Sequence, residues 1–285
     1  MPIKINHVSY YYLKKTPNEV KALDDVSFEI KDNSITTIIG HTGSGKSTLI
    51  QLLNALEIPS EGEIQVNDFL ITPKKRKNKK IKELRRHIAS IFQFPEYQLF
   101  EETVEKDVAF GLKNFKVKEI DAINKAHEAL ELVGLDESFY KRSPFELSGG
   151  EKRRAAIAGI LVLNPDVLIL DEPTAGLDPQ GTKIILDLIK KLHSEGKTII
   201  LVTHDMNIVL SLATDVVVLK NGQLAYQGNP HDLFALNEED LSLEIPPLYL
   251  LAHQLIAKGL KINIKNIKDI DSLFLEIDKA RSKHD

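Results

Sequence analysis

The sequence predicts an α/β fold whose core is a parallel β-sheet. Three short apolar runs, residues 34–40, 167–170 and 198–202, have the length of buried strands. Segments with helical periodicity alternate with them, as in sheets whose strands are joined by crossover helices. A glycine-rich turn follows the first run, at the point where a strand passes into a helix. The chemistry of that turn indicates which kind of α/β protein this is.

The composition is that of an ordinary globular chain and excludes several classes of function. The 285 residues are 42% apolar and 27% charged, and the net charge of −4 provides no global basic field for nucleic acid. The absence of cysteine excludes disulfides, thiolate metal sites and a cysteine nucleophile. No run approaches the ~18 apolar residues that span a bilayer, and the N-terminus lacks the apolar core of a signal peptide. We therefore expect a cytoplasmic chain that reaches a membrane only peripherally, through a partner.

The glycine-rich turn, "GHTGSGKS", matches the phosphate-binding pattern G-x-x-x-x-G-K-[ST]. Its glycines lack a Cβ, so the chain can bend tightly and present backbone N–H groups to an anion. Lys46 adds a positive charge for the β- and γ-phosphates, and Ser47 offers a hydroxyl to Mg²⁺. The helix that follows points its N-terminal dipole at the same anion. The predicted nucleotide contacts are Gly40, His41, Thr42, Gly43, Ser44, Gly45, Lys46, Ser47 and Thr48.

Two carboxylates follow the apolar run at 167–170. They stand at the C-terminal end of the predicted strand, where open α/β sheets bind ligands. Asp171 is the predicted metal ligand, through water, and Glu172 the predicted general base that aligns the attacking water. The alternative is a carboxylate pair that caps the next helix, which the neighbouring phosphate loop disfavours.

Two further polar residues follow predicted strands. His204 comes after the run at 198–202 and could donate a hydrogen bond to the γ-phosphate, although a lone histidine is more often structural. Gln93 ends the strand in "IASIFQFPE" and can coordinate metal or water. The sequence therefore predicts a catalytic set of Glu172, His204 and Gln93, with Ser47, Gln93 and Asp171 around the metal.

Residues 147–161, "LSGGEKRRAAIAGIL", resemble the signature of ABC ATPases, and "AGLD" at 175–178 resembles their D-loop. Phosphate loop, Gln loop, signature, acidic strand, D-loop and switch histidine follow in the family's order over about residues 3–235. The resemblance implies a P-loop NTPase with a RecA-like parallel-sheet core and an N-terminal antiparallel β region. It also implies a nucleotide-binding domain over 1–240, with a helical signature subdomain at about 94–163.

The resemblance further implies a head-to-tail dimer that sandwiches two ATP molecules. Ser148, Gly149 and Gly150 would then bind the γ-phosphate of the partner's ATP, because a Ser-Gly-Gly turn that opens a helix presents backbone amides. Asp178 would help to link the two sites. The chain departs from the family at Glu151, where Gln is usual, and this places a negative charge near the triphosphate.

The family stacks the adenine base on an aromatic side chain near the N-terminus. Three tyrosines, residues 10–12, precede the core, and the spacing favours Tyr12 for this contact. The alternative is that these tyrosines are ordinary residues of a pleated strand.

The segment "FQFPEYQLFEETV", residues 92–104, groups the apolar side chains of Phe94, Tyr97, Leu99 and Phe100. They either pack into the helical subdomain or form a docking surface. The segment is similar to the one after the Gln loop in energy-coupling factor (ECF) transporter ATPases, and in particular in the second of their two paired ATPases. This implies that an integral-membrane coupling subunit docks near Phe94–Phe100.

The tail, 241–285, contains two short amphipathic patterns that could pack on the rest of the chain or on another chain. The family uses such a tail for pairing ATPases, and we favour that role. The predicted apolar faces consist of Leu248, Leu251, Ala252, Leu255 and Ile256, and of Ile267, Ile270, Phe274 and Ile277.

A basic run at 74–86 holds nine Lys or Arg and one Glu. We expect a solvated loop, while anionic lipid or nucleic acid are alternatives. No aromatic residue interleaves the run, which disfavours binding of single-stranded nucleic acid.

Taken with the resemblance, these motifs imply an ATP-binding and hydrolysing subunit of an ECF importer on the cytoplasmic face of the cell membrane. A paralogous ATPase would complete a heterodimer, and a separate membrane subunit would bind a vitamin or transition-metal ion. The alternative is a soluble ABC ATPase acting on nucleic acid or ribosomes. A single cassette, no zinc cysteines, and too little chain between Gln93 and Leu147 for a long coiled coil disfavour it. A small-molecule P-loop kinase would leave the "LSGG" unexplained.

Overall fold

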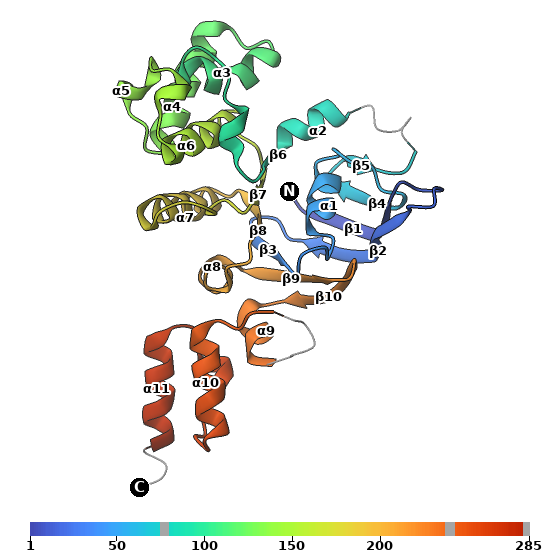
Figure 1. Cartoon of the computed structure of the whole chain (residues 1–285), viewed down its shortest axis with the longest axis vertical. Coiled ribbons are helices and arrows are strands. Elements are labelled where there is room, and N and C mark those ends of the chain that lie inside the picture. Colours follow the sequence, from blue (N-terminus) through green and yellow to red (C-terminus); the bar gives the residue numbers. More distant parts are fainter. Residues whose placement is uncertain (75–79, 237–242, 282–285) are drawn as a thin grey trace.

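The computed structural model describes residues 1–74, 80–236 and 243–281, which form two β-sheets and several groups of helices (Figure 1). A four-stranded antiparallel sheet has the order β2-β1-β4-β5, and a six-stranded sheet has the order β10-β9-β3-β8-β7-β6. The predicted α/β class with a parallel-sheet core and an antiparallel β region is confirmed. The predicted domain boundary at 240 lies outside the described residues, and the division into domains stays a prediction.

The six-stranded sheet carries the residues of interest at its carboxyl edge. β3, β8 and the apolar part of β7 are buried throughout, as expected for parallel strands covered on both faces. β10 pairs antiparallel with β9 at one edge of the sheet, while the other five strands run parallel. The strands are β3 (Ile35–Ile39), β6 (Ile88–Ile91), β7 (Val167–Asp171), β8 (Thr198–Val202), β9 (Asp215–Lys220) and β10 (Gln223–Gly228).

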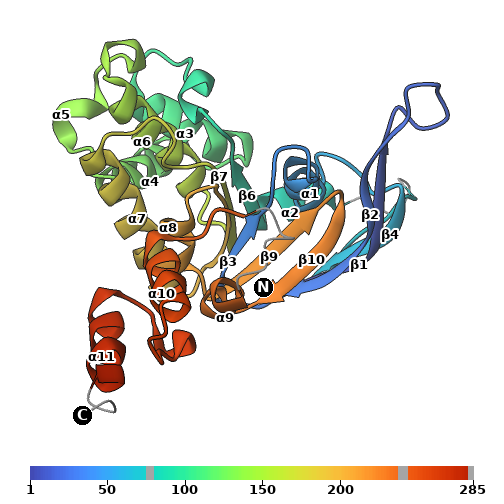
Figure 2. The same cartoon turned by 60° about the horizontal axis from the view of Figure 1, so that its bottom comes forward.

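The antiparallel sheet packs beside this core, and the hairpin between β1 and β2 projects from it (Figure 2). β3 follows these strands in the sequence but joins the other sheet. Every residue of β3 is buried, so it needs cover on both faces, whereas β1 and β2 also carry exposed residues. The strands are β1 (Ile3–Tyr12), β2 (Val20–Ile30), β4 (Glu61–Val66) and β5 (Phe69–Ile71).

Apart from the helix that precedes β6, the helices of the described residues divide into three sets. α1 (Lys46–Leu53), α7 (Pro179–Ser194) and α8 (Met206–Leu212) follow strands of the parallel sheet. A second group lies at one end of the long axis in Figure 1, and α10 and α11 lie at the other end. The second group comprises the 3₁₀ helices η2 (Pro95–Gln98) and η3 (Pro144–Glu146) with α3 (Val104–Asn114), α4 (Glu119–Leu132), α5 (Glu137–Tyr140) and α6 (Gly149–Leu161). The third comprises α9 (Pro230–Leu236), α10 (Pro247–Ala257), η5 (Ile264–Asn266) and α11 (Ile270–Arg281).

Part of the basic run is helical, so the expectation of a loop was wrong there. Residues 75–79 lie outside the described residues, but α2 (Ile81–His87) follows directly. Lys82 and Arg86 lie over the ring of Phe115, each 5.6 Å from its centroid. This contact gives two of the basic side chains a packing role.

Within the described residues, the apolar faces predicted for the tail are only partly covered. In α10, Tyr249 and Ala252 are buried, whereas Leu251 is half exposed. In α11, Ile270 and Phe274 are 65% and 61% exposed. The Tyr249 hydroxyl donates to the carbonyl of Ile267 at 2.6 Å and so draws a different face of α10 inward.

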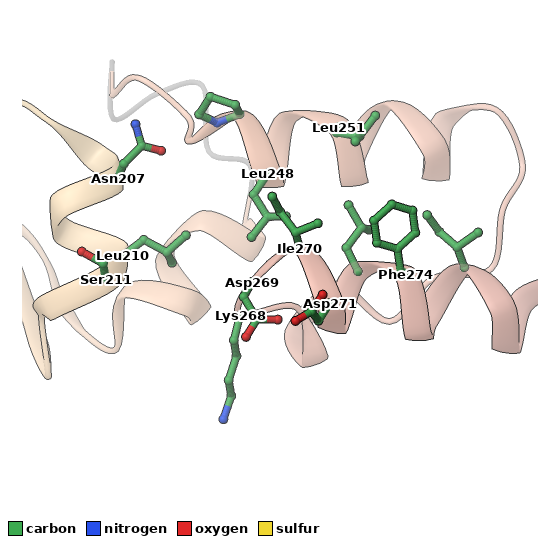
Figure 3. Close-up of a pocket in the computed structure, with 13 residues that line it drawn as sticks. Asn207, Leu210, Ser211, Leu248, Leu251, Lys268, Asp269, Ile270, Asp271 and Phe274 are labelled. Carbon is green, nitrogen blue, oxygen red and sulfur yellow. The ribbon is translucent and has the colours of Figure 1, made fainter. Parts of the chain in front are cut away.

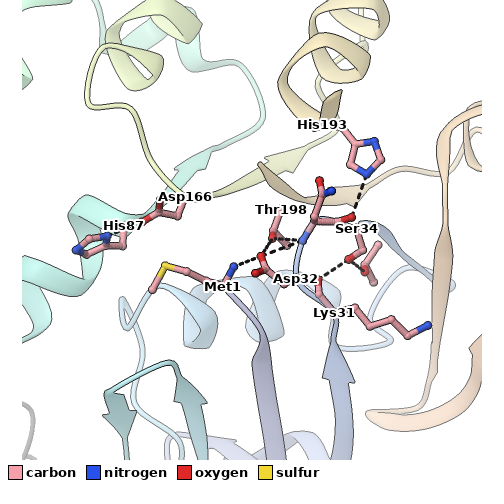
Figure 4. A network of polar contacts seen from close by, with 10 residues as sticks. Met1, Lys31, Asp32, Ser34, His87, Asp166, His193 and Thr198 are labelled. Carbon is pink, nitrogen blue, oxygen red and sulfur yellow. Dashed lines mark hydrogen bonds and ion pairs between the residues drawn. The ribbon is translucent and has the colours of Figure 1, made fainter. Parts of the chain in front are cut away.

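Polar contacts close the amino-terminal edge of the parallel sheet, opposite the edge that carries the motifs (Figure 4). Asp32 accepts hydrogen bonds from the backbone N–H of Asn33 at 2.9 Å and from the Thr198 hydroxyl at 3.1 Å. Its carboxylate also pairs with the amino group of Met1, and this contact lowers the pKa of Asp32. The contacts tie the chain before β3 to the start of β8.

Candidate functional site

The phosphate loop wraps around the ammonium group of Lys46. Its Nζ donates to the carbonyl oxygens of Gly40 at 2.7 Å and His41 at 3.0 Å. Burial lowers the pKa of Lys46, while the carboxylates of Glu172 and Asp171 act in the opposite direction. The strand end, the loop and the first turn of α1 thus converge on one cation that faces two acids.

The neighbouring backbone explains why two loop positions are glycine. Gly40 has φ +147°, and a Cβ there would lie 2.2 Å from the carbonyl oxygen of Leu219 in β9. Gly45 has φ +104°, and its Cβ would lie 2.7 Å from the carbonyl oxygen of Ala22 in β2. A Cβ at Gly43 would meet no atom of the described residues within 4 Å. The loop is therefore held against both sheets at Gly40 and Gly45 and is open at Gly43.

We predict that Gly40→Ala destabilises the protein by about 3 kcal/mol, because the new Cβ displaces either the loop or β9. Gly43→Ala is the matched control in the same loop: it is strained by φ +81° but meets no steric obstacle, so we expect a loss of about 1 kcal/mol. Denaturant unfolding of both variants measures the difference. Equal losses would contradict the close packing of the loop against β9.

The two acids stand at the end of β7 as predicted. Asp171 is the last residue of the strand, and the backbone N–H of Glu172 donates to the carbonyl of Val202 at 2.9 Å. Burial, followed by the charge of Glu172, raises the pKa of Asp171, and Lys46 lowers it. Glu172 has φ +49°, an uncommon conformation that turns the chain out of the sheet immediately after the strand.

His204 lies against Glu172. Its Nδ1 is 2.9 Å from Oε1 of Glu172, and this hydrogen bond raises the pKa of His204. The Thr203 hydroxyl donates to the other carboxylate oxygen at 3.5 Å. The sequence analysis missed Thr203, although a hydroxyl residue at the end of a buried strand was a usable signal.

Two further predicted residues come from segments that contact α1 or pair with β7. The Tyr12 hydroxyl is 3.0 Å from the Thr48 hydroxyl in α1, and the Tyr12 ring packs edge-on against Tyr10 with centroids 4.9 Å apart. Tyr12 therefore stands next to the phosphate-loop helix. Gln93 is exposed and follows β6, the strand paired with β7.

The signature forms a helix N-terminus in which Glu151 takes part. The Ser148 hydroxyl accepts from the backbone N–H of Glu151 at 3.4 Å, and a Glu151 carboxylate oxygen accepts from the backbone N–H of Ser148 at 2.7 Å. This capping box lowers the pKa of Glu151 and so keeps it ionised. The structure thus gives Glu151 a local role, as the cap of α6.

A cavity of about 550 Å³ lies between the signature and the D-loop and is lined by Ser148, Gly150, Glu151, Gly176 and Asp178 among others. α6 lies apart from α1 in both views of the chain (Figures 1 and 2). The structure therefore does not bring Ser148, Gly149 and Gly150 together with the phosphate loop of the same chain.

The segment at 92–104 divides between surface and core. Tyr97 is 85% exposed, and Phe94 and Phe100 are also exposed. Leu99 is only 9% exposed and packs in the core of the helical group, so for this side chain the first of the two alternatives holds. The ring of Phe110 in α3 packs edge-on against Phe100 with centroids 4.9 Å apart, an apolar neighbour that the local sequence did not indicate.

Comparison with known proteins places this geometry in a family. The family described as ABC transporter matches residues 23–175. The chain is 50% identical to the energy-coupling factor transporter ATP-binding protein EcfA2 of Streptococcus pneumoniae serotype 2, over 94% of this chain and 96% of that protein. It is 47% identical to the protein of the same name from Clostridioides difficile, over 99% of each.

Solved structures agree with these relatives. CbiO1 of Clostridium perfringens, described as part of the ABC transporter complex cbiONQ, superposes with a TM-score of 0.73 at 38% identity and covers 88% of this chain and 98% of its own. A dimeric ATP-binding cassette bound to ADP and Pi superposes with a TM-score of 0.71 at 31% identity, over 80% of this chain and 98% of its own. The chain therefore belongs to the ABC transporter family, as an ATP-hydrolysing, ATP-binding subunit of the energy-coupling factor type.

Proposed function

We propose that this chain holds Mg²⁺ and ATP between its phosphate loop and the end of β7 and uses hydrolysis to drive an ECF importer. The observation that carries the proposal is the convergence of charges there. Lys46 interacts with both Asp171 and Glu172, and His204 is hydrogen-bonded to Glu172. A cation, two acids and a histidine at the carboxyl edge of a parallel sheet suit phosphoryl transfer to water.

In the proposed reaction, the loop amides at 40–48 bind the phosphates and Lys46 exchanges its two carbonyl partners for phosphate oxygens. Glu172 accepts a proton from the attacking water as the γ-phosphoryl group leaves ADP. His204 donates a hydrogen bond to the γ-phosphate. Tyr12 stacks on the adenine base.

The proposed set of metal ligands fits Mg²⁺. Ser47, Asp171 and Gln93 offer hydroxyl, carboxylate and amide oxygens, the donors that Mg²⁺ prefers. The pKa of Asp171 is raised by burial and by Glu172, so a second positive charge beside Lys46 would stabilise the ionised pair. When bound, Mg²⁺ would neutralise charge on the phosphates.

A second ATPase subunit would complete the site. Ser148 caps α6 and Gly149 and Gly150 open it, apart from α1, so the backbone N–H groups of the two glycines and the Ser148 hydroxyl would serve the ATP of a partner. The resemblance to the second of two paired ATPases supports a paralogous partner and a heterodimer.

The tail offers a further contact for that partner. A groove of about 860 Å³ lies between α8, α10 and α11 (Figure 3). Leu248 and Leu251 line it from α10, and Ile270 and Phe274 line it from α11. We propose that these apolar side chains help to pair the two ATPases.

The membrane side is proposed to lie at Phe94, Tyr97 and Phe100, where an integral-membrane coupling subunit would dock. None of the helices in residues 1–74, 80–236 and 243–281 is long and apolar enough to cross a bilayer. The chain would therefore sit on the cytoplasmic face of the membrane through this contact. A separate membrane subunit would bind the vitamin or transition-metal ion.

Tyr97→Asp and Phe100→Asp should release the folded chain from membranes that contain its coupling subunit, because each places a charge in an apolar contact. Co-sedimentation with those membranes, together with ATP-driven uptake, measures the effect. Leu13→Asp, on the exposed β1–β2 hairpin, is the matched control and should stay bound. If both docking variants co-sediment like the wild type, or if the wild type sediments with ribosomes instead, the importer assignment fails. Leu99→Asp is unsuitable because it would bury a charge.

A further inference from the structure

Arg153 is a buried cation in α6, the helix that begins at the signature. It is not among the predicted nucleotide contacts. It lies on α6, shortly after Ser148–Gly150, and is 3% exposed. A charge that is removed from water needs close partners of opposite charge or hydrogen-bond acceptors. The partners of Arg153 come from two segments that lie far from it in the sequence.

The first partner is the segment proposed to dock the membrane subunit. Nε of Arg153 lies 3.2 Å from one carboxylate oxygen of Glu96, and Nη2 lies 3.4 Å from the other. Glu96 belongs to η2, between the exposed rings of Phe94 and Tyr97. The guanidinium also lies over the Phe94 ring, 5.4 Å from its centroid. Arg153 therefore holds η2 by a two-pronged ion pair and a ring contact.

The second partner is the loop that carries the proposed general base. Nη1 of Arg153 donates to the carbonyl oxygen of Ala175. The backbone N–H of Ala175 donates in turn to the carbonyl of Glu172 at 3.2 Å. The same loop continues to Asp178, whose side chain accepts from the backbone N–H of Gly181 at 2.6 Å as the cap of α7. One hydrogen bond thus separates the partner of Arg153 from the backbone of Glu172.

We propose that Arg153 is a positioning residue that ties the position of the docking segment to that of Glu172. The proposal rests on the proposed function, in which Phe94–Phe100 receives the coupling subunit and Glu172 activates water. A shift of η2 would move Glu96, then the guanidinium, and then the carbonyl of Ala175. Arginine suits this place because its planar fork has five donors and reaches two segments at once, whereas the lysine ammonium is a single point.

The test is a double-mutant cycle in the assembled complex of this chain, its partner ATPase and the membrane subunits. The variants are Arg153→Lys, Glu96→Gln and the double substitution, and kcat and KM for ATP are measured per ATP-binding site. We expect Arg153→Lys to lower kcat about tenfold with KM near the wild-type value, and Glu96→Gln to lower it less. The double variant should be no slower than Arg153→Lys, because both changes break the same connection.

A control variant distinguishes the positioning role of Arg153 from the effect of losing any ion pair in the helical group. Lys113 and Glu119 form an exposed pair at 2.8 Å in the same helical group, and Glu119→Gln should leave kcat unchanged. Thermal unfolding of each variant checks that kcat is compared between folded proteins. Provided that the wild-type complex hydrolyses ATP normally, either of two results would overturn the proposal. The first is a kcat per site in Arg153→Lys equal to that of the wild type, and the second is a double variant in which the two single effects multiply. A wild-type complex that does not hydrolyse ATP would instead overturn the proposed function and this inference with it.

Discussion

Glu172→Gln should lower the rate of ATP hydrolysis by more than about 100-fold and leave ATP binding intact. Gln keeps the shape of the side chain but cannot accept the proton of the attacking water. The binding of ATP by Lys46 and the phosphate loop depends less on Glu172, because the carbonyl oxygens of Gly40 and His41 also hold Lys46 in place. Single-turnover hydrolysis and equilibrium ATP binding, measured on the same preparation, distinguish the two effects.

The substitution carries an internal check. The hydrogen bond that His204 donates to Glu172 is the largest cause of the raised pKa of His204, so that pKa should fall towards its ordinary value in Glu172→Gln. An NMR titration of His204 follows this change. The exposed Glu195 at the end of α7 gives the matched control, and Glu195→Gln should hydrolyse ATP at the wild-type rate. Rapid turnover in Glu172→Gln, with the pKa of His204 lowered, would remove Glu172 from the role of base.

Lys46→Ala should weaken ATP binding about 100-fold. Hydrogen bonds to charged groups contribute about 1.5–3 kcal/mol each, and about 1.4 kcal/mol corresponds to a factor of ten in Kd. The ammonium is already enclosed by the loop and faces Asp171 and Glu172. Its removal would leave two neighbouring carboxylates against a triphosphate, so the loss includes new repulsion. Titration calorimetry with ATP and magnesium measures the change in Kd.

The control for Lys46→Ala is Lys31→Ala. Lys31 is exposed and paired with Asp215 at 2.7 Å, at the opposite edge of the parallel sheet. Its loss removes the same charge from the protein but should leave ATP affinity close to that of the wild type. Equal affinities for Lys46→Ala and the wild type would refute the assignment of residues 40–48 as the phosphate site.

The sequence by itself determined the features that depend on local patterns. The phosphate loop is a continuous stretch in which glycines, Lys46 and Ser47 stand at fixed spacing. The buried strands around it are visible in the sequence as short apolar runs. Glu172 and His204 each stand two residues beyond such a run, so the rule that parallel strands place their carboxyl ends at one edge was enough to predict that they meet. The resemblance to ABC ATPases rested on the order of these local motifs.

The tertiary structure decided the features that depend on what packs against a residue. Leu99 is buried although its neighbours Tyr97 and Phe100 are not, because only one side of that turn meets the helical group. Phe274 is exposed although its helix has the expected period, because α10 meets another face. Arg153 reaches Glu96 and Ala175 through contacts between segments far apart in the chain. The burial of a side chain and its contacts with distant segments depend on how the whole chain packs, so they cannot be predicted from the local spacing of residues.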